Sequence, residues 1–168
     1  QQCVAVKNLA TAEYLVSADA HANISANDSA WQFSRNAADA EAFFLKPAAL
    51  DSFLLYDRAG RFLSTSLIKV TRDAVASKRA EWRIHKLALY VGHKQVDEKY
   101  TLVSIPNNLR LLRGQTGPVI KGTGDRVQTD YALDLVPQPA DACREFPEAA
   151  LDAQVAEDFY PHDNSHDT

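Results

Sequence analysis

The chain has 168 residues, which is enough for one globular domain with a hydrophobic core and too short for two. Hydrophobic residues make up 46% and charged residues 24%, as in ordinary globular proteins. No apolar run approaches the roughly eighteen residues of a membrane span, and no basic stripe indicates nucleic-acid binding. The 22 acids and 18 bases are unevenly divided, because residues 144–168 hold seven acids and one base. We therefore expect a nearly neutral body followed by an acidic tail.

The chain contains no methionine and begins with Gln1. This start fits a mature end left after removal of a signal peptide, although an artificial boundary would look the same.

One spacing of apolar residues recurs three times along the chain. Each set has a second member ten residues after the first and a third member eight residues later, as expected for short strands joined by tight turns. The three sets are Val6, Val16 and Ile24; Leu45, Leu55 and Leu63; Leu102, Leu112 and Ile120.

A fourth strand follows each set, and its apolar residues alternate in the period-2 manner of a half-buried strand. These pairs are Trp31 and Phe33, Trp82 and Ile84, and Leu133 and Leu135. Gly60 and Gly117 each lie five residues after the middle member of a set, where we expect a turn with positive φ. The first set has His21 at that place, so its turn must differ.

Twelve short strands in three four-stranded units are the arrangement of a β-trefoil, in which six strands form a barrel and six cap it as hairpins. A generic β-sandwich is the alternative. We predict an all-β, pseudo-threefold trefoil over residues 1–143, with the nine spaced residues, Trp31 and Trp82 in one core. Residues 144–168 are expected to form an extended or short-helical acidic linker. The stretches between Leu63 and Trp82 and from Gly92 to Lys99 are expected to be solvated connections or partner contacts.

The two cysteines, Cys3 and Cys143, lie near the ends of this predicted unit. Because a trefoil brings its termini together, we expect a Cys3–Cys143 disulfide rather than two free core thiols. A disulfide in turn favours a secreted or periplasmic location.

Motifs for catalysis are missing, so no catalytic residue, cofactor or metal is predicted. His85 and His93, with Asp97 and Glu98 near them in sequence, are better explained as surface residues. His162 and His166 are spaced like two metal ligands on a helix, but their acidic, polar surroundings favour a solvated tail. Asn23 and Asn27 begin glycosylation sequons, which matter only in a eukaryotic secretory pathway.

Within the tail, four apolar residues could anchor the chain to another surface, a catalytic domain or a second chain. They are Leu151, Val155, Phe159 and Tyr160.

The threefold pattern over residues 4–136 resembles the β-trefoil superfamily, which includes ricin-type lectins, fascins, Kunitz-type inhibitors and cytokines. Ricin-type lectins show Gln-x-Trp in the last strand of each repeat, and this chain lacks that glutamine before Trp31 and Trp82. The resemblance therefore implies that these tryptophans are core residues rather than sugar platforms.

The segments Phe43–Leu63 and Cys143–Ala149 are similar to the trefoil and exit linker of secreted bacterial metal-dependent hydrolases of the amidohydrolase type. This resemblance implies a non-catalytic accessory domain that packs against a catalytic partner. Two alternatives stay open. A lectin-like domain would present shallow pockets, for example around Tyr56 and Asp57, and a Kunitz-type inhibitor would need a rigid exposed loop, for which Thr71–Lys78 is the candidate.

Overall fold

The structure is a computed structural model, which describes residues 3–17, 30–49, 51–91, 94–114, 117–122 and 131–143, with the side chains of 88–91 and 94–98 excepted. Its described residues form twelve strands, two 3-10 helices (η) and one short α-helix. In chain order these are β1 Cys3–Asn8, β2 Glu13–Ser17, β3 Trp31–Ser34, η2 Ala37–Asp39, β4 Phe43–Pro47, β5 Phe53–Tyr56, β6 Phe62–Ser66, β7 Lys69–Asp73, η3 Lys78–Ala80, β8 Trp82–Val91, β9 Lys94–Ser104, β10 Leu109–Arg113, β11 Pro118–Lys121, β12 Leu133–Pro137 and α1 Ala140–Cys143.

Six strands pair antiparallel into a closed ring, in the order β1, β4, β5, β8, β9 and β12. The ring closes where β12 returns to β1, with Val4 to Asn8 paired in register with Pro137 to Leu133. The other six strands form three hairpins, β2–β3, β6–β7 and β10–β11. The fold is thus all-β with a closed barrel, as the sequence predicts.

The pairings correct the predicted alignment of the second set. Val6 and Leu102 lie on the ring strands β1 and β9, and Val16 and Leu112 lie on the hairpin strands β2 and β10. Leu45 and Leu55, however, lie on β4 and β5, which are both ring strands. The second set therefore begins one strand early. Spacing alone misses this shift, because strands joined by turns of similar length give the same ten-residue interval whichever strands pair.

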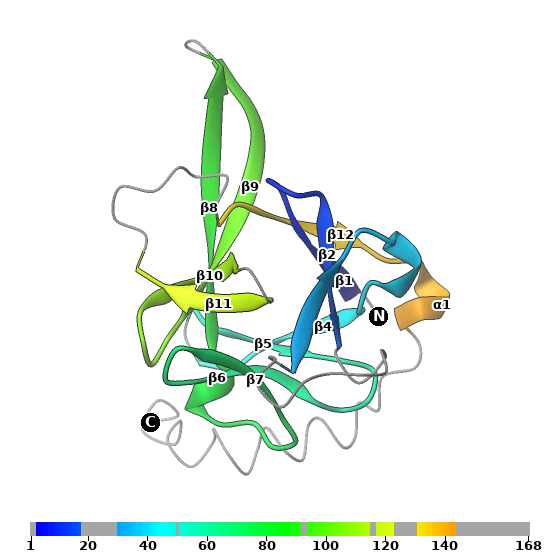
Figure 1. Cartoon of the computed structure of the whole chain (residues 1–168), viewed down its shortest axis with the longest axis vertical. Coiled ribbons are helices and arrows are strands. Elements are labelled where there is room, and N and C mark those ends of the chain that lie inside the picture. The colour runs from blue at the N-terminus through cyan, green and yellow to red at the C-terminus, as the bar shows by residue number, and fades with distance from the viewer. Residues whose placement is uncertain are drawn as a thin grey trace, which may run out of the picture.

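Two stretches expected to be solvated connections contain strands instead. Between Leu63 and Trp82 the chain forms β7, which pairs with β6 over five residues, and then η3. Lys94–Lys99 belongs to β9, which pairs with β8 in a long hairpin. This hairpin projects well beyond the barrel (Figure 1). Each of the two strand segments has a single apolar residue, Val70 in β7 and Val96 in residues 94–99, so no period-2 pattern marks either strand in the sequence.

The central core is one cluster of buried side chains and includes both tryptophans, each with no exposed surface. Its members are Val6, Leu15, Trp31, Phe43, Leu55, Leu63, Val70, Trp82, Leu102, Leu111, Ile120 and Leu133. The predicted places of Val6, Leu55, Leu63, Leu102, Ile120, Trp31 and Trp82 in one core are therefore confirmed.

Three of the remaining predicted core residues differ from expectation, and one cannot be compared. Leu45 packs against the cluster but is only half-buried. Val16 and Leu112 are buried at 1% and 5% exposure yet lie outside the cluster. Their neighbours Leu15 and Leu111 take the inward places, since successive strand residues face opposite sides. Ile24 lies outside the described residues.

The predicted turn glycines adopt positive φ, at 83° for Gly60 and 144° for Gly117. An L residue with a Cβ rarely adopts these angles, which explains glycine at both places.

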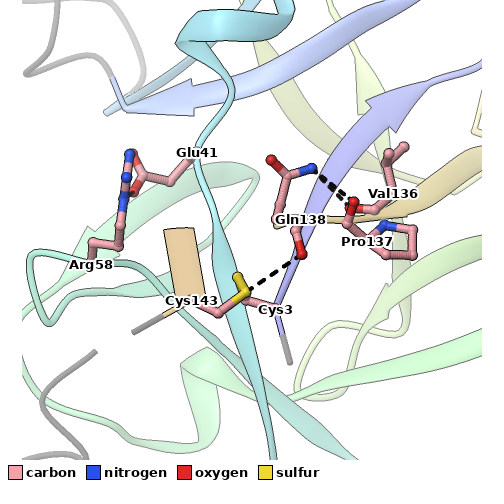
Figure 2. The surroundings of a disulfide bond; sticks show 7 residues. All are labelled: Cys3, Glu41, Arg58, Val136, Pro137, Gln138 and Cys143. Atoms are coloured by element: carbon pink, nitrogen blue, oxygen red, sulfur yellow. Dashed lines mark hydrogen bonds and ion pairs between the residues drawn. A yellow bond between two sulfur atoms is a disulfide. The ribbon is translucent and has the colours of Figure 1, made fainter. Parts of the chain in front are cut away.

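Cys3 and Cys143 form a disulfide with their Cα atoms 5.5 Å apart, across a sequence separation of 140. Both cysteines are buried in a second cluster that includes Leu54, Tyr56 and Phe62. Figure 2 shows the surroundings: the Cys143 Sγ lies 3.8 Å from the carbonyl oxygen of Gln138. The Gln138 backbone N–H donates to the Cys3 carbonyl oxygen at 3.0 Å. The bridge thus fastens α1 to the first residue of β1, beside the seam where the ring closes.

Removing the bridge should destabilise the domain. In the chain-entropy model, a link across 140 residues contributes about 5 kcal/mol, and measured losses for native bridges are about 2–5 kcal/mol. We expect the double variant Cys3→Ser/Cys143→Ser to lose free energy of unfolding in this range in urea titrations. Mass spectrometry after alkylation should find no free thiol in the native, unreduced protein. Two alkylated thiols would contradict the bridge.

Shortening Leu55 should open a cavity in the central core, because its side chain has no exposed surface. Leu55→Ala should lower the free energy of unfolding by about 2–5 kcal/mol. Ile68→Ala is the control, since Ile68 is 69% exposed, and should change it by less than about 0.5 kcal/mol. Equal effects of the two substitutions in urea unfolding would refute the core assignment.

Candidate functional site

The strand β3 carries two aromatic side chains, Trp31 and Phe33, on one face, because they are two residues apart. A guanidinium lies over each ring. The Arg72 Cζ is 5.6 Å from the Trp31 ring centroid, and the Arg113 Cζ is 6.0 Å from that of Phe33. Each arginine also pairs with a carboxylate. The same three-part stack of aromatic ring, arginine and acid therefore occurs twice on one strand.

The Trp31 stack is sealed inside the protein. The Arg72 Nε donates to the Asp57 Oδ2 at 2.8 Å, and the two side chains are 9% and 0% exposed. The other Asp57 oxygen accepts the backbone N–H groups of Ala59 and Arg61 at 3.0 and 2.9 Å. Both oxygens of the Asp57 carboxylate therefore have partners, one in the turn after β5 and the other in Arg72. Its role is to fix the turn and neutralise a buried cation.

This arrangement corrects the lectin pocket expected around Tyr56 and Asp57. Tyr56 is 1% exposed, and its ring packs against Phe62 with centroids 4.7 Å apart. Burial raises the pKa of the Tyr56 hydroxyl, and the nearby Asp57 charge adds to the effect. Neither side chain can face a ligand. Asp57 points inward, where it accepts hydrogen bonds from backbone donors of its own turn.

The Phe33 stack reaches the surface. The Arg113 Nε donates to the Glu13 Oε1 at 2.9 Å, and the Nη2 lies 3.4 Å from the Oε2. The Arg113 Nη1 donates to the Gly114 carbonyl oxygen at 2.5 Å, which fixes the guanidinium plane. The side chains of Arg113 and Glu13 are 32% and 11% exposed, and Phe33 is half-buried. We call Glu13, Phe33 and Arg113 the open stack.

The carboxylate of the open stack is ionised. The hydrogen bond from Arg113 holds the pKa of Glu13 below its ordinary 4.5, against the opposing effect of desolvation. A hydrogen bond with Thr11 and the charges of Arg113 and Arg35 lower the pKa further. The group therefore combines a fixed anion, a fixed cation and a partly exposed aromatic ring.

The groups of the open stack are of the kinds that bind a polar ligand. A carboxylate and a guanidinium offer hydrogen-bond acceptors and donors to a polyhydroxylated ligand, and a ring offers an apolar surface. Within the described residues, no three His, Cys, Asp or Glu side chains gather as a possible metal site. Both cysteines of the chain are in the disulfide, so no thiol nucleophile is available.

The histidine group considered from sequence is not assembled. His85 is exposed on β8 opposite Thr101, whereas Asp97 and Glu98 lie opposite Leu89 and Ala88. The strand register thus separates His85 from both acids by at least three residues along the hairpin.

The proposed inhibitor loop Thr71–Lys78 is not one exposed segment. Thr71 belongs to β7, Ala76 is fully buried, and Lys78 starts η3. The Thr71 hydroxyl donates to Asp73, which also pairs with Arg79 at 3.4 Å. A protease-binding loop must stay extended and accessible over several residues, and buried Ala76 interrupts this one.

Several residues singled out in the sequence fall outside the described residues. They are His93, the sequon residues Asn23 and Asn27, the tail histidines His162 and His166, and the four expected partner-contacting residues Leu151, Val155, Phe159 and Tyr160. Of the helices in the described ranges, none has the length and hydrophobicity to cross a bilayer.

The open stack was not predicted. Glu13 and Arg113 are 100 residues apart. They lie on β2 and β10, which do not pair with each other, so only the tertiary fold brings them together. One weak signal was available: each is a charged residue at the end of a short strand with apolar residues at its centre, Glu13–Ser17 and Leu109–Arg113.

No protein-family model matches the chain, and neither does any curated protein sequence. Solved structures do match. The designed 3-fold symmetric protein ThreeFoil has a TM-score of 0.58 at 17% identity, covering 80% of this chain and 97% of that one.

Two further structures are similar to this chain. A salivary protein from Culex quiquefasciatus, of the Cysteine and Tryptophan-Rich (CWRC) family, has a TM-score of 0.59 at 14% identity, covering 80% of this chain and 92% of that one. SeviL, solved bound to the asialo-GM1 saccharide, has a TM-score of 0.58 at 10% identity, and the match covers 83% of this chain and 97% of SeviL. At these identities the likeness shows the fold alone, and that fold is the β-trefoil.

Proposed function

We propose that this chain is a non-catalytic, carbohydrate-binding domain of the lectin-like kind, with the open stack as its binding site. The observation that carries the proposal is the contrast between the two stacks on β3. The Trp31 stack is fully enclosed, whereas the Phe33 stack has the same parts with the arginine 32% exposed. A structural role accounts for the enclosed one, and a partly exposed ion pair adds little to stability.

The chemistry of the open stack fits a sugar. Sugar hydroxyls both donate and accept hydrogen bonds, so they can bridge an ionised Glu13 and the Arg113 guanidinium. The C–H face of a pyranose ring can pack on the exposed part of Phe33. The fold neighbour SeviL, which was solved with a saccharide bound, supports a sugar as the ligand class. The Cys3–Cys143 disulfide supports a secreted or periplasmic location, where glycans are accessible.

The accessory-domain hypothesis is the second proposal, in which the chain packs against a hydrolase through Leu151, Val155, Phe159 and Tyr160. The comparisons give no link to amidohydrolase-type enzymes, so it rests on the sequence resemblance and on the acidic composition of residues 144–168. The reading frame after Thr168 distinguishes the two. A hydrolase domain opening with a His-x-His motif would support the accessory role, and a stop codon with a monomer in solution would end it.

A glycan array should detect binding of the purified chain to at least one glycan. Arg113→Met should weaken this binding at least about tenfold, because it removes the guanidinium and leaves Glu13 unpaired. Arg110→Met is the matched control, because Arg110 is on the same strand and its Cζ lies 4.5 Å from the Tyr131 ring centroid, outside the open stack. It should bind as the native chain does. A blank array, or equal losses in both variants, would refute the site.

Binding should also depend on pH through Glu13. Because its folded pKa is lowered below 4.5, the ionised form persists on acidification to that value and is lost only as the pH falls further. Affinity should therefore be constant on acidification from neutral pH and decline only at pH values below 4.5. Isothermal titration measures this, with circular dichroism to confirm that the protein stays folded. Glu13→Gln should bind weakly at every pH, and a native-like affinity of this variant would contradict the role of the carboxylate.

A further inference from the structure

The turn of the β6–β7 hairpin presents two large apolar side chains to water. Leu67 and Ile68 are 83% and 69% exposed. Within the described ranges, Val75 at 52% is the other large hydrophobic residue with such exposure. Leu67 and Ile68 are adjacent and occupy the whole turn, because Ser66 and Lys69 on either side already pair with each other. We call Leu67 and Ile68 the apolar tip.

The backbone of the apolar tip is unfavourable for its sequence. Leu67 has a φ of 56°, in the left-handed region that a bulky residue seldom adopts. Two-residue hairpin turns with positive φ at the first position usually have glycine, asparagine or aspartate there. Leucine costs stability at this position, and its side chain gains no burial in return. The turn thus exposes two apolar side chains to water, and it does so with a backbone conformation that is unfavourable for leucine.

The strand end below the tip is held by several hydrogen bonds. The Asn107 Nδ2 donates to the hydroxyl oxygens of Thr65 and Ser104, both at 3.1 Å. The Arg79 Nε donates to the Thr65 carbonyl oxygen at 2.7 Å. Thr65 and Ser104 are buried at 1% and 0% exposure. These contacts fix the base of the turn, so that the tip is a rigid protrusion.

Two lysines lie beside the apolar tip. Lys69 closes the turn and is exposed. Val119 of β11 pairs with Lys69, and the antiparallel direction then places the exposed Lys121 on the side of the turn. In β6, β7, η3 and β11 together the single acid is Asp73, which lies at the far end of β7 and pairs with Arg79. The tip therefore presents apolar side chains with positive charge beside them.

The small apolar area of the tip and the positive charge beside it indicate what kind of partner could cover it. A stable protein interface needs about 800 Å² from each partner, far more than two convex side chains provide. A bilayer surface accepts small apolar insertions at the boundary of headgroups and acyl chains, and anionic lipids attract nearby lysines. We infer that the apolar tip docks the domain onto an anionic membrane surface, with Leu67 and Ile68 inserted and Lys69 and Lys121 at the level of the phosphates. This inference goes beyond sugar binding and does not depend on it.

Vesicle co-sedimentation tests the inference with vesicles that carry no sugar ligand. The native chain should bind phosphatidylcholine vesicles that contain about one third phosphatidylglycerol, and bind pure phosphatidylcholine at least about tenfold more weakly. The double variant Leu67→Gly/Ile68→Ser should lose binding at least about tenfold. Its melting temperature should be equal or higher, because glycine relieves the backbone at position 67. Val75→Ser is the matched control and should bind as the native chain does.

Charge is tested separately with Lys69→Glu/Lys121→Glu, which should abolish the preference for anionic vesicles. Three outcomes would overturn the inference: no binding of the native chain to anionic vesicles, unchanged binding of the Leu67→Gly/Ile68→Ser variant, or equal loss in Val75→Ser. A native chain that ignores vesicles but forms dimers which the tip substitutions dissociate would also overturn it, in favour of a second copy as occupant. Because the vesicles lack glycans, failure here leaves the sugar-binding proposal standing.

Discussion

The rest of the structure depends on the pairing of β1 with β12, the first and last strands described. This pairing closes the ring, and every core side chain that points into the barrel depends on that closure. Its two strands are about 130 positions apart, so the contact forms late relative to local hairpins and carries a large loop-closure cost. The disulfide lies beside this seam and offsets part of that cost by restricting the unfolded chain.

The two tryptophans show how a barrel of this size is filled. The indole N–H of Trp31 donates to the Thr71 carbonyl oxygen, and that of Trp82 donates to the Leu63 carbonyl oxygen, both at 2.8 Å. Each large ring is thereby buried without leaving a polar group unpaired. Both indoles anchor to the β6–β7 hairpin, so that one hairpin is fastened to the core from two directions.

Much of the fold could be predicted from sequence because it depends on local patterns. Alternating residues indicated β8 and β12, and Gly60 and Gly117 indicated turns. The disulfide followed from the closeness of the ends in a trefoil. The strand β7 was missed because Val70 is its single apolar residue. The second set is shifted because apolar spacing records where strands begin but not which strands pair. The open stack could not be predicted for a related reason. Glu13 and Arg113 become neighbours only through the arrangement of β2 and β10 around the barrel, and neither residue type alone marks a site.

The 140-residue span of the disulfide has a consequence for how the protein matures. With two cysteines in these residues there is a single intramolecular pairing, so oxidation within one molecule yields no mispaired isomer to be reshuffled. Until the barrel forms, however, Cys3 and Cys143 are separated by a long loop, so a cysteine of another molecule can compete for either thiol at high protein concentration. The competing product is a covalent dimer. The rate at which the dimer forms rises with protein concentration, whereas the rate at which the bridge forms within one molecule does not. Dilution during oxidation should therefore favour the native bridge within one molecule. No isomerase is needed to reach it.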